Sequence, residues 1–393
     1  MFLCGVAYSY GVAMPSIRAD FDLTKAQASL PFSAILVSYT LGMWLGGITQ
    51  DRVGPTRACL GGAVLFGGGF AMAGLMPGLW TLSLAYGLVC GFGIGVSYVA
   101  ATATAVRWFP ERRGLAAGCV VLGFGLGALL LAPLKQWLIA AHGWRMAFVG
   151  MGTCFLLGGT VLALLVRPPQ EEIVLSDADG IVRAPSSLTT RGVLRTARFR
   201  LIWLAWALSM CAGLGWMAHL AAMAEGAGLS AAAAAWTLSA VAVTNGLSRP
   251  LAGALADKVG RLPTLIGAVA LFSVVGLFMV LPMDGGWRFF VAGAFFGACF
   301  GTLLVNYSPV AAEFFGPRHL GSNLGLLYTS YGAGALSGPA LFGWLHDRTG
   351  SYAAAVQLSI GLTLAALGLF YWAQQREAKR TAPPPSGDVT QAA

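Results

Sequence analysis

Apolar runs of membrane-spanning length follow one another along this chain. Hydrophobic residues make up 57% of its 393 residues, charged residues make up only 10%, and the mean hydropathy is +0.73. Soluble domains carry about a quarter charged residues, so this chain has too little polar surface to cover a water-soluble globule. A helix that crosses the hydrocarbon core needs roughly 20 apolar residues. The sequence therefore predicts an all-α integral membrane protein.

The apolar runs predict twelve transmembrane helices in two six-helix bundles. The first six are expected at 1–17, 29–50, 58–77, 80–105, 113–139 and 145–166, and the second six at 199–224, 231–256, 262–283, 287–314, 320–345 and 351–373. Residues 1–167 and 199–373 would form the two bundles. Residues 168–198 have no apolar periodicity and are predicted to be a cytoplasmic linker. Residues 374–393, with a Pro-Pro-Pro-Ser-Gly run, are predicted to be a disordered cytoplasmic tail.

The distribution of basic residues predicts the orientation in the membrane. Most arginines and lysines fall in the loops on the side of the linker, and only Arg18, Lys25, Arg145, Arg288 and Arg348 fall in the opposite loops. Cytoplasmic loops carry the excess of basic residues. We therefore expect both termini in the cytoplasm and a multi-pass protein of the inner or plasma membrane. The first run opens at Met1 without a basic segment and is short for a span, so a cytoplasmic leader is expected upstream of it.

The net charge of +9 does not indicate a nucleic-acid partner, because the basic residues lie in short loops between apolar runs. The seven cysteines lie singly in apolar stretches, so neither a disulfide framework nor a metal site is indicated. The four histidines are scattered without the spacing of metal ligands or of a nucleophile–base pair. We expect no cofactor and no enzymatic activity.

A short loop occurs twice, each time after the second helix of a half. The pattern is a small residue, three further residues, Asp, a basic residue, Val and Gly. The aspartate would end its helix at the membrane surface and pair with a basic residue or a neighbouring helix N-terminus. Such a contact could act as a conformational latch, whereas the simpler interpretation is an ordinary membrane hairpin turn. The predicted latch residues are Gly47, Asp51, Arg52, Gly54 and Arg57 in the first copy, and Asp257, Lys258, Gly260 and Arg261 in the second.

The repeated loop, the six-plus-six layout and the central linker resemble the major facilitator superfamily over essentially the whole chain. The segment Trp108–Gly118 (WFPERRGLAAG) and the segment Gly246–Arg249 (GLSR) resemble the monocarboxylate porters and the oxalate:formate antiporters. This resemblance implies two six-helix domains that rock about a central site, and an arginine that binds the substrate carboxylate. The oxalate-type antiporters place a lysine in helix eleven, where this chain has Tyr328-Thr329-Ser330-Tyr331.

Arg249 lies within the eighth predicted helix, eight residues from Asp257, or about 12 Å along the axis. An arginine at the bilayer centre costs about 2.5–3.5 kcal/mol on insertion scales, so such residues usually face a cavity or a partner. No acidic residue is expected at this depth, because Glu225 and Glu313 lie at helix edges. A guanidinium without an acidic partner is suited to a substrate carboxylate, which it can bind with two hydrogen bonds. The alternative is a structural arginine satisfied by backbone carbonyls.

Other polar residues inside the helices complete the predicted site. Asn245 lies one turn before Arg249 on the same face. Hydroxyls would come from Tyr331, Tyr98 and Tyr8, with Tyr10 an alternative to Tyr8, although each could instead be a packing residue. His219 is a candidate proton relay or a packing histidine. Lys135 is expected near the outer surface, with its side chain reaching toward the interface.

The sequence thus predicts a secondary transporter of a small monocarboxylate such as lactate or pyruvate. One deep cation matches one carboxylate, which favours a monocarboxylate over oxalate. The partners would be the organic anion, a proton and the lipid bilayer, and the chain is expected to function as a monomer. Proton symport is the first interpretation. Anion exchange of the oxalate:formate type and a non-transporting membrane sensor are the alternatives.

Overall fold

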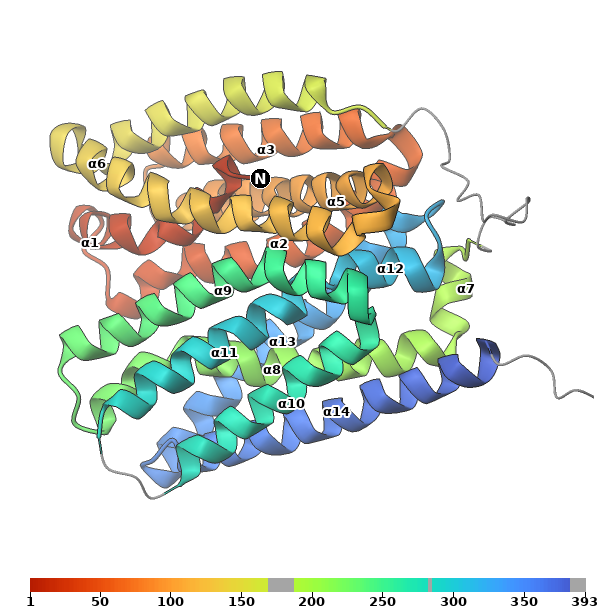
Figure 1. Cartoon of the computed structure of the whole chain (residues 1–393). Coiled ribbons are helices and arrows are strands. Elements are labelled where there is room, and N and C mark those ends of the chain that lie inside the picture. Colours follow the sequence, from red (N-terminus) through yellow and green to blue (C-terminus); the bar gives the residue numbers. More distant parts are fainter. Residues whose placement is uncertain (169–186, 282–284, 382–393) are drawn as a thin grey trace, which may run out of the picture.

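The computed structural model describes residues 1–168, 187–281 and 285–381, and every regular element within these ranges is a helix (Figure 1). The elements of the first half are η1 (Leu3–Ser9), α1 (Tyr10–Asp20), α2 (Lys25–Val53), α3 (Pro55–Leu75), α4 (Leu79–Leu82), η2 (Ser83–Cys90), α5 (Gly91–Trp108), η3 (Pro110–Arg112) and α6 (Arg113–Leu165). Those of the second half are α7 (Thr190–Arg195), α8 (Ala197–Gly226), α9 (Ala231–Val259), α10 (Arg261–Val280), α11 (Trp287–Val305), α12 (Tyr307–Phe315), α13 (Leu320–Thr349) and α14 (Ala353–Thr381).

Within the described residues, eight helices are long and apolar enough to cross a membrane. One of them, Pro110–Leu165, contains two of the predicted spans, because α6 reverses direction at Gly143. This glycine has φ +78° and ψ +160°, a conformation that side chains rarely adopt. Three predicted spans are not among these eight helices, namely those that correspond to η1–α1, α9 and α13. In α9 the polar residues Thr237, Thr244 and Ser248 face glycines of α11. In α13 Thr329 and Ser330 form hydrogen bonds within the second half, to Trp203 and Tyr307.

Short polar residues start several of the long helices. Thr24 and Gln27 form a capping box at the start of α2, in which the Gln27 amide N–H binds the Thr24 hydroxyl and the Gln27 side chain accepts from the Thr24 N–H. Thr196 and Ser230 accept from backbone N–H groups in the first turns of α8 and α9. These caps satisfy amides that have no partner within the helix. They fix where each span begins.

Three predicted segments differ in the structure. The first span is not one α-helix over 1–17, because it opens as the 3₁₀ helix η1 and becomes α-helical only at Tyr10. The end of the predicted linker holds the short helix α7, capped by Thr189. Residues 374–381 were expected to be disordered, but α14 continues through Thr381, and Glu377 pairs with Arg198 at the start of α8. The rest of the linker and of the tail, 169–186 and 382–393, lies outside the described residues.

The two halves meet through two helix pairs, α2 with α13 and α6 with α9. Within the halves, α3 packs on α6 and α5, and α8 packs on α13 and α14. The turns at Gly54 and Gly260, helix α7 and the end of α14 all lie at one end of the molecule, on the right of Figure 1. We call this the linker end, and we call the other end, which holds the turn at Gly143, the far end.

Candidate substrate site and latch

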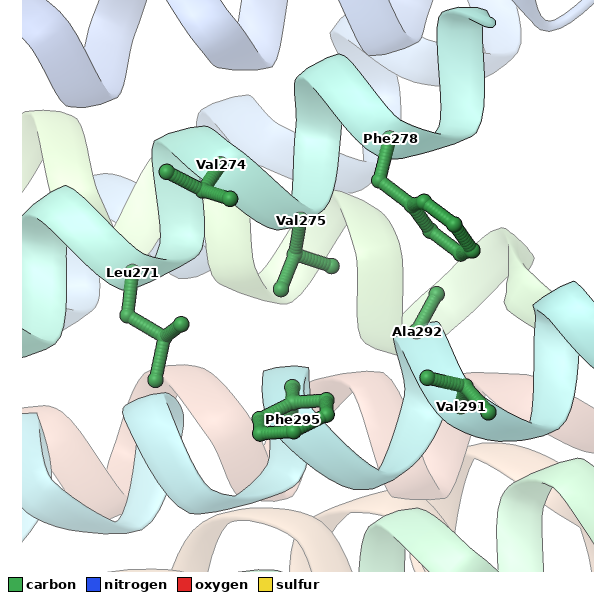
Figure 2. A pocket seen from close by; sticks show the side chains of 7 residues that line it. All are labelled: Leu271, Val274, Val275, Phe278, Val291, Ala292 and Phe295. Atoms are coloured by element: carbon green, nitrogen blue, oxygen red, sulfur yellow. The ribbon is translucent and has the colours of Figure 1, made fainter.

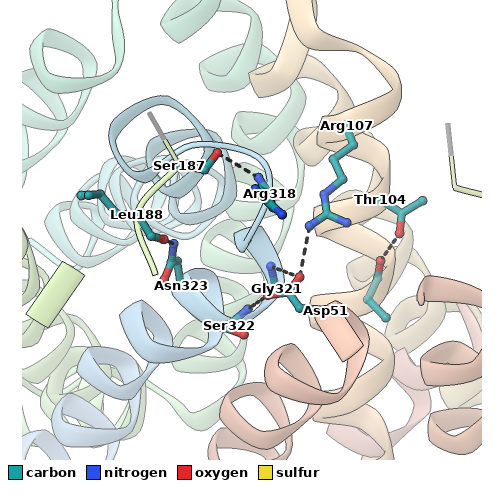
Figure 3. Close-up of polar contacts among 10 residues, drawn as sticks. Asp51, Thr104, Arg107, Ser187, Leu188, Arg318, Gly321, Ser322 and Asn323 are labelled. Atoms are coloured by element: carbon teal, nitrogen blue, oxygen red, sulfur yellow. Dashed lines mark hydrogen bonds and ion pairs between the residues drawn. The ribbon is translucent and has the colours of Figure 1, made fainter. Parts of the chain in front are cut away.

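The first copy of the repeated loop joins the two halves at the linker end. The Asp51 carboxylate, near the end of α2, accepts hydrogen bonds from the backbone N–H groups of Gly321 (3.0 Å) and Ser322 (2.6 Å) at the start of α13 (Figure 3). The Nη2 atom of Arg107, from α5, lies 3.1 Å from the same carboxylate. A negative charge at a helix N-terminus is favourable, so this contact holds α2 against α13.

The second copy makes the same contact with the halves exchanged. The Asp257 carboxylate, near the end of α9, accepts hydrogen bonds of 2.9 Å from the backbone N–H groups of both Gly114 and Leu115 at the start of α6. Its cation is Arg261, one turn on, at 2.5 Å. Arg261 also lies 3.4 Å from Glu313 of α12. The two aspartates therefore bind the halves to each other with pseudo-twofold symmetry.

Glycines make this approach possible. A Cβ atom at Gly47 would lie 2.0 Å from the carbonyl oxygen of Gly321, and one at Gly253 would lie 2.1 Å from that of Gly114. Only glycine allows the backbones to come this close. Gly54 and Gly260 have φ +87° and +102°, and each ends a helix while beginning the next. The small residues of the motif therefore act at two places, the helix contact and the turn.

The basic residues of the two loops separate into paired and exposed groups. Arg261 is buried and paired, whereas Arg52, Arg57 and Lys258 are exposed. The cation that pairs with Asp51 is Arg107, which the sequence did not single out. It directly precedes the Trp108–Gly118 segment, and its place at the end of a span facing the loop was the available signal.

The last residues of the linker are attached beside the first latch. The Leu188 N–H donates to the Phe315 carbonyl at 2.9 Å, and the Asn323 amide donates to the Leu188 carbonyl at 2.9 Å (Figure 3). The backbone N–H of Arg318 donates to the Ser187 hydroxyl at 3.3 Å. The end of the linker is thereby fixed to the start of α13, beside the amides that Asp51 binds.

Arg249 lies where α9 meets α6, between the two halves. Its Nη1 atom donates to the Val121 carbonyl of α6 at 2.7 Å, and its Nε atom is buried without a hydrogen-bond partner. Gly125 of α6 lies beside the guanidinium, because a Cβ there would be in ordinary van der Waals contact with Nη1, at 3.6 Å. Among the described residues, no carboxylate forms an ion pair with Arg249. One backbone carbonyl meets part of its hydrogen-bonding capacity, and its charge is not balanced.

Tyrosines from both halves gather close to this arginine. The Tyr328 hydroxyl of α13 donates to the Tyr98 hydroxyl of α5 at 3.3 Å, across the two halves. Tyr39 of α2 contacts both Tyr98 and Tyr331 edge to face, with ring centroids 5.7 and 6.2 Å apart. Tyr98 also contacts Phe124 of α6 edge to face, with ring centroids 6.0 Å apart, and the next residue, Gly125, lies beside the Arg249 guanidinium. The predicted Tyr98 and Tyr331 are therefore brought together, and Tyr328 and Tyr39 are members that the sequence analysis missed.

The other predicted binding residues are placed less centrally. Asn245 is buried on α9, and its backbone carbonyl lies close to Gly301 of α11. Tyr8 belongs to η1, and its side chain is outside the described part of the structure. Tyr10 is buried, and its hydroxyl donates to the Ala28 carbonyl of α2 at 2.9 Å. Its hydroxyl is therefore already used within the first half.

His219 connects three segments of the second half. Its Nε2 atom lies 3.0 Å from the Pro339 carbonyl of α13, and its Nδ1 atom lies 3.1 Å from the hydroxyl of Tyr352 before α14. A carbonyl only accepts, so Nε2 carries a proton in this arrangement. Burial, and then the Asp347 charge, raise the pKa of Tyr352 above its ordinary value.

The sequence analysis expected the Lys135 side chain to reach toward the membrane–water interface, and the structure does not place it there. Its side chain is fully buried, and Nζ donates to the Ser9 carbonyl of η1 at 3.2 Å. Phe148 lies beneath the ammonium, with 4.7 Å between Nζ and the ring centroid. The count of residues along the helix gave the depth of Lys135, but the direction of its side chain depends on how the helix is turned toward its neighbours.

An apolar groove lies between α10 and α11, lined by Leu271, Val274, Val275, Phe278, Val291, Ala292 and Phe295 (Figure 2). Its lining holds no group that could bind an anion or a proton. Leu271, Val274 and Phe295 are among the exposed apolar side chains, as expected of a surface that faces lipid. The candidate substrate site is therefore placed at Arg249 and the tyrosines.

Comparison with known proteins establishes the class. The family model of the Major Facilitator Superfamily matches residues 1–230 and 209–392, and the chain belongs to this superfamily of membrane transporters. The fold agrees: the structure of FucP from E. coli in the outward conformation matches with a TM-score of 0.72 at 16% identity, covering 95% of this chain and 96% of FucP. The chain is a multi-pass membrane transporter and not an enzyme, as the sequence predicted.

Two relatives indicate the branch of the superfamily. The chain is 29% identical to human monocarboxylate transporter 11 over 377 residues, which cover 92% of this chain and 78% of the relative. It is 26% identical to the oxalate:formate antiporter of Oxalobacter formigenes over 355 residues, which cover 87% of this chain and 83% of the relative. The predicted resemblance to this branch is confirmed.

Proposed function

We propose that this transporter carries a small monocarboxylate such as lactate or pyruvate by alternating access, coupled to a proton. The observation that carries the proposal is the unbalanced charge of Arg249 between the two halves. Its Nε atom is buried without a partner, and no carboxylate pairs with it among the described residues. A bound carboxylate would supply both the missing charge and the missing acceptor.

The tyrosines support a small substrate. Tyr98 and Tyr328 come from opposite halves and already share a hydrogen bond, so an anion on Arg249 would lie beside hydroxyls of both halves. The absence of a lysine at Tyr328-Thr329-Ser330-Tyr331 leaves Arg249 to hold a single carboxylate. The names of the relatives, a monocarboxylate transporter and an oxalate:formate antiporter, agree with an anionic cargo.

The latch loops would control access from one side. In this structure Asp51 and Asp257 hold the halves together at the linker end. We propose that this end faces the cytoplasm, in keeping with the excess of basic residues, and that both contacts break when the transporter opens inward. The predicted latch residues Arg52, Arg57 and Lys258 would then be surface charges of the latch loops, and the ion pairs with the aspartates would be those of Arg107 and Arg261.

The test is uptake of labelled lactate into proteoliposomes by the wild type, Arg249→Lys and Arg249→Ala. Loss of a charge-assisted bidentate contact removes about 1.5–3 kcal/mol, so the alanine variant should transport at least about tenfold less at low lactate concentration. The lysine variant should retain part of the activity, because it keeps the charge but not the planar geometry. Arg348→Ala, which removes an exposed arginine of the same half, is the matched control. Wild-type rates in Arg249→Ala would remove this residue from the site.

Exchange is distinguished from proton symport with the same vesicles. A proton gradient should drive lactate accumulation if the transporter is a symporter. If uptake requires an internal anion and ignores the gradient, the protein is an exchanger. Binding of lactate without any flux would identify a sensor instead.

A further inference from the structure

Lys135 is the most completely buried basic side chain that the proposed substrate site does not use. It lies on α6, inside the first half, and is 0% exposed. Three aromatic rings surround its Nζ atom, at 4.7, 5.5 and 6.0 Å from the ring centroids of Phe148, Phe70 and Tyr86. The Ser9 carbonyl of η1 is the hydrogen-bond acceptor found for it among the described residues.

None of the described groups that face Lys135 is a carboxylate. The η2 helix contributes Tyr86 and Cys90, and both α3 and the second part of α6 contribute phenylalanine rings. From α1 comes Tyr10, whose ring centroid lies 5.1 Å from that of Tyr86. Among the described residues, the Lys135 ammonium contacts three aromatic rings and one backbone carbonyl, and no carboxylate is paired with it.

An amine and a guanidinium differ in how they respond to such a site. The charge of a buried cation without an anionic partner is costly, and an amine can remove that cost by giving up its proton. Arginine stays charged in proteins. The two sites therefore differ: Arg249, partly buried between the halves, is a permanent cation, and Lys135, fully buried, is a removable one. Only the second can carry a proton.

The backbone beside Lys135 is irregular on two sides. Ser9, which accepts from Nζ, lies at the point where the 3₁₀ helix η1 passes into α1. Tyr86 and Cys90 belong to η2, a π-helical segment over Ser83–Cys90. Segments of this kind mark places where a helix changes shape during function. A rearrangement of either segment would change the solvent access and the acceptor of the amine together.

We infer that Lys135 is the residue that binds and releases the transported proton. This inference rests on the proposed monocarboxylate transport and names the residue that couples it to the proton gradient. When the first half opens, the ammonium gives one proton to water in the pathway and remains as a neutral amine. It takes one proton back from the other side, so each cycle moves one proton without any change in Arg249.

The experiment compares two kinds of flux for Lys135→Met in proteoliposomes. Methionine keeps the length and the fit of the side chain but has no charge. The variant should retain exchange of labelled for unlabelled lactate and lose accumulation driven by a proton gradient. It should also lose the lactate-induced proton influx that the trapped dye pyranine reports. Lys135→Arg should lose the same two signals, because its charge is fixed.

Two further variants locate the effect. Arg348→Met removes an exposed cation from above the Trp344 ring and should keep both accumulation and proton influx. His219→Gln removes the histidine predicted as a relay, and it too should keep both if Lys135 carries the proton. Accumulation lost in His219→Gln but kept in Lys135→Met would assign the proton to His219 and overturn the inference.

A measurement on the wild-type protein guards against loss of folding in the variants. Lysine labelled with ¹³C and ¹⁵N would give a signal for Lys135, assigned by its absence from Lys135→Arg. This signal should titrate in the pH range over which uptake changes, and a signal that stays fully charged there would overturn the inference. If the wild type exchanges lactate while Lys135→Met still accumulates it, only the inference fails. If the wild type neither exchanges nor accumulates lactate, the proposed function fails with it.

Discussion

The two latch aspartates differ in the source of their cation. Asp257 takes Arg261 from its own loop, one helical turn on, so this ion pair survives any movement between the halves. Asp51 takes Arg107 from α5, a different helix of the same half. Each aspartate also binds two amides of the opposite half, and in the proposed latch these are the contacts of the aspartates that break on opening. In the proposed latch, the carboxylate–amide contacts would determine the stability of the closed state.

Asp51→Asn should shift the transporter toward the state that is open at the linker end. Asparagine keeps the size of the side chain but removes the charge that faces the Gly321 and Ser322 amides. Hydrogen bonds to charged groups contribute about 1.5–3 kcal/mol, so the population of the open state should rise by about tenfold or more. The measurement is the distance distribution between spin labels at positions 57 and 318. The matched control is Arg52→Gln, the exposed neighbour, and an unchanged distribution in Asp51→Asn would mean that this contact is not a latch.

For single residues, the sequence showed which side chains are unusual for a membrane helix, but it did not show which residues they contact. Arg249, the two aspartates and the glycines were identifiable because each is unusual for its position in a membrane helix. Which of Tyr328 and Tyr331 faces Tyr98, and that Lys135 points into the first half, depend on helix rotation. An apolar chain with little amphipathic contrast does not encode rotation in its periodicity. Arg107 was hidden among the many basic residues of its side.

Helix irregularity distinguishes the first half from the second in this structure. The first and fourth spans contain η1 and η2, and both lie against Lys135. The corresponding spans of the second half, α8 and α11–α12, are α-helical, with a change of element only at Asn306. Two of the three helices of the first half that depart from the α-helix, η1 and η2, therefore lie beside the proposed proton site, and the third, η3, precedes α6.

The turn at Gly143 should be intolerant of a side chain. With φ +78° and ψ +160°, Gly143→Ala would destabilise the protein by about 1–3 kcal/mol, although no atom lies within 4 Å of the position that a Cβ would take. The check is the thermal unfolding midpoint in detergent. Gly150→Ala is the control, because Gly150 is helical and exposed with open space around it, and alanine favours the helix by about 0.5–1 kcal/mol. Equal midpoints for the two variants would contradict the conformational argument.

The spans themselves were predictable from apolar length, whereas their internal breaks were not. Hydropathy places 113–139 and 145–166 correctly, and the glycine between them supplies the turn. Hydropathy does not predict η1 or η2, because 3₁₀, π and α segments inside a membrane span are equally apolar. The extension of α14 to Thr381 was missed because Gln374 to Arg380 is polar. Polar residues end a membrane span but do not end a helix, and Glu377 has a partner in Arg198.

In the molecule as a whole, the two halves contribute equivalent groups to the interface between them. Each half supplies one aspartate, one glycine and one helix N-terminus, and each half receives the same set from the other. Most contacts between the halves lie along α2 with α13 and α6 with α9, and the Tyr328–Tyr98 hydrogen bond joins α13 to α5. This arrangement suits a rocking motion in which both contacts open together.

Because each half binds the other through the same aspartate–amide contacts, we expect the two halves to associate even without a peptide bond between them. Two separately encoded chains, 1–168 and 187–393, should assemble in the membrane and copurify, because the recognition surface is complete on both sides. Leucine in place of Gly47 or Gly253 should abolish copurification, since a side chain there would strike a backbone carbonyl. Leucine at Gly68, which faces open space, should have no effect. The covalent connection would then keep together two halves whose pairing the exchanged contacts already specify.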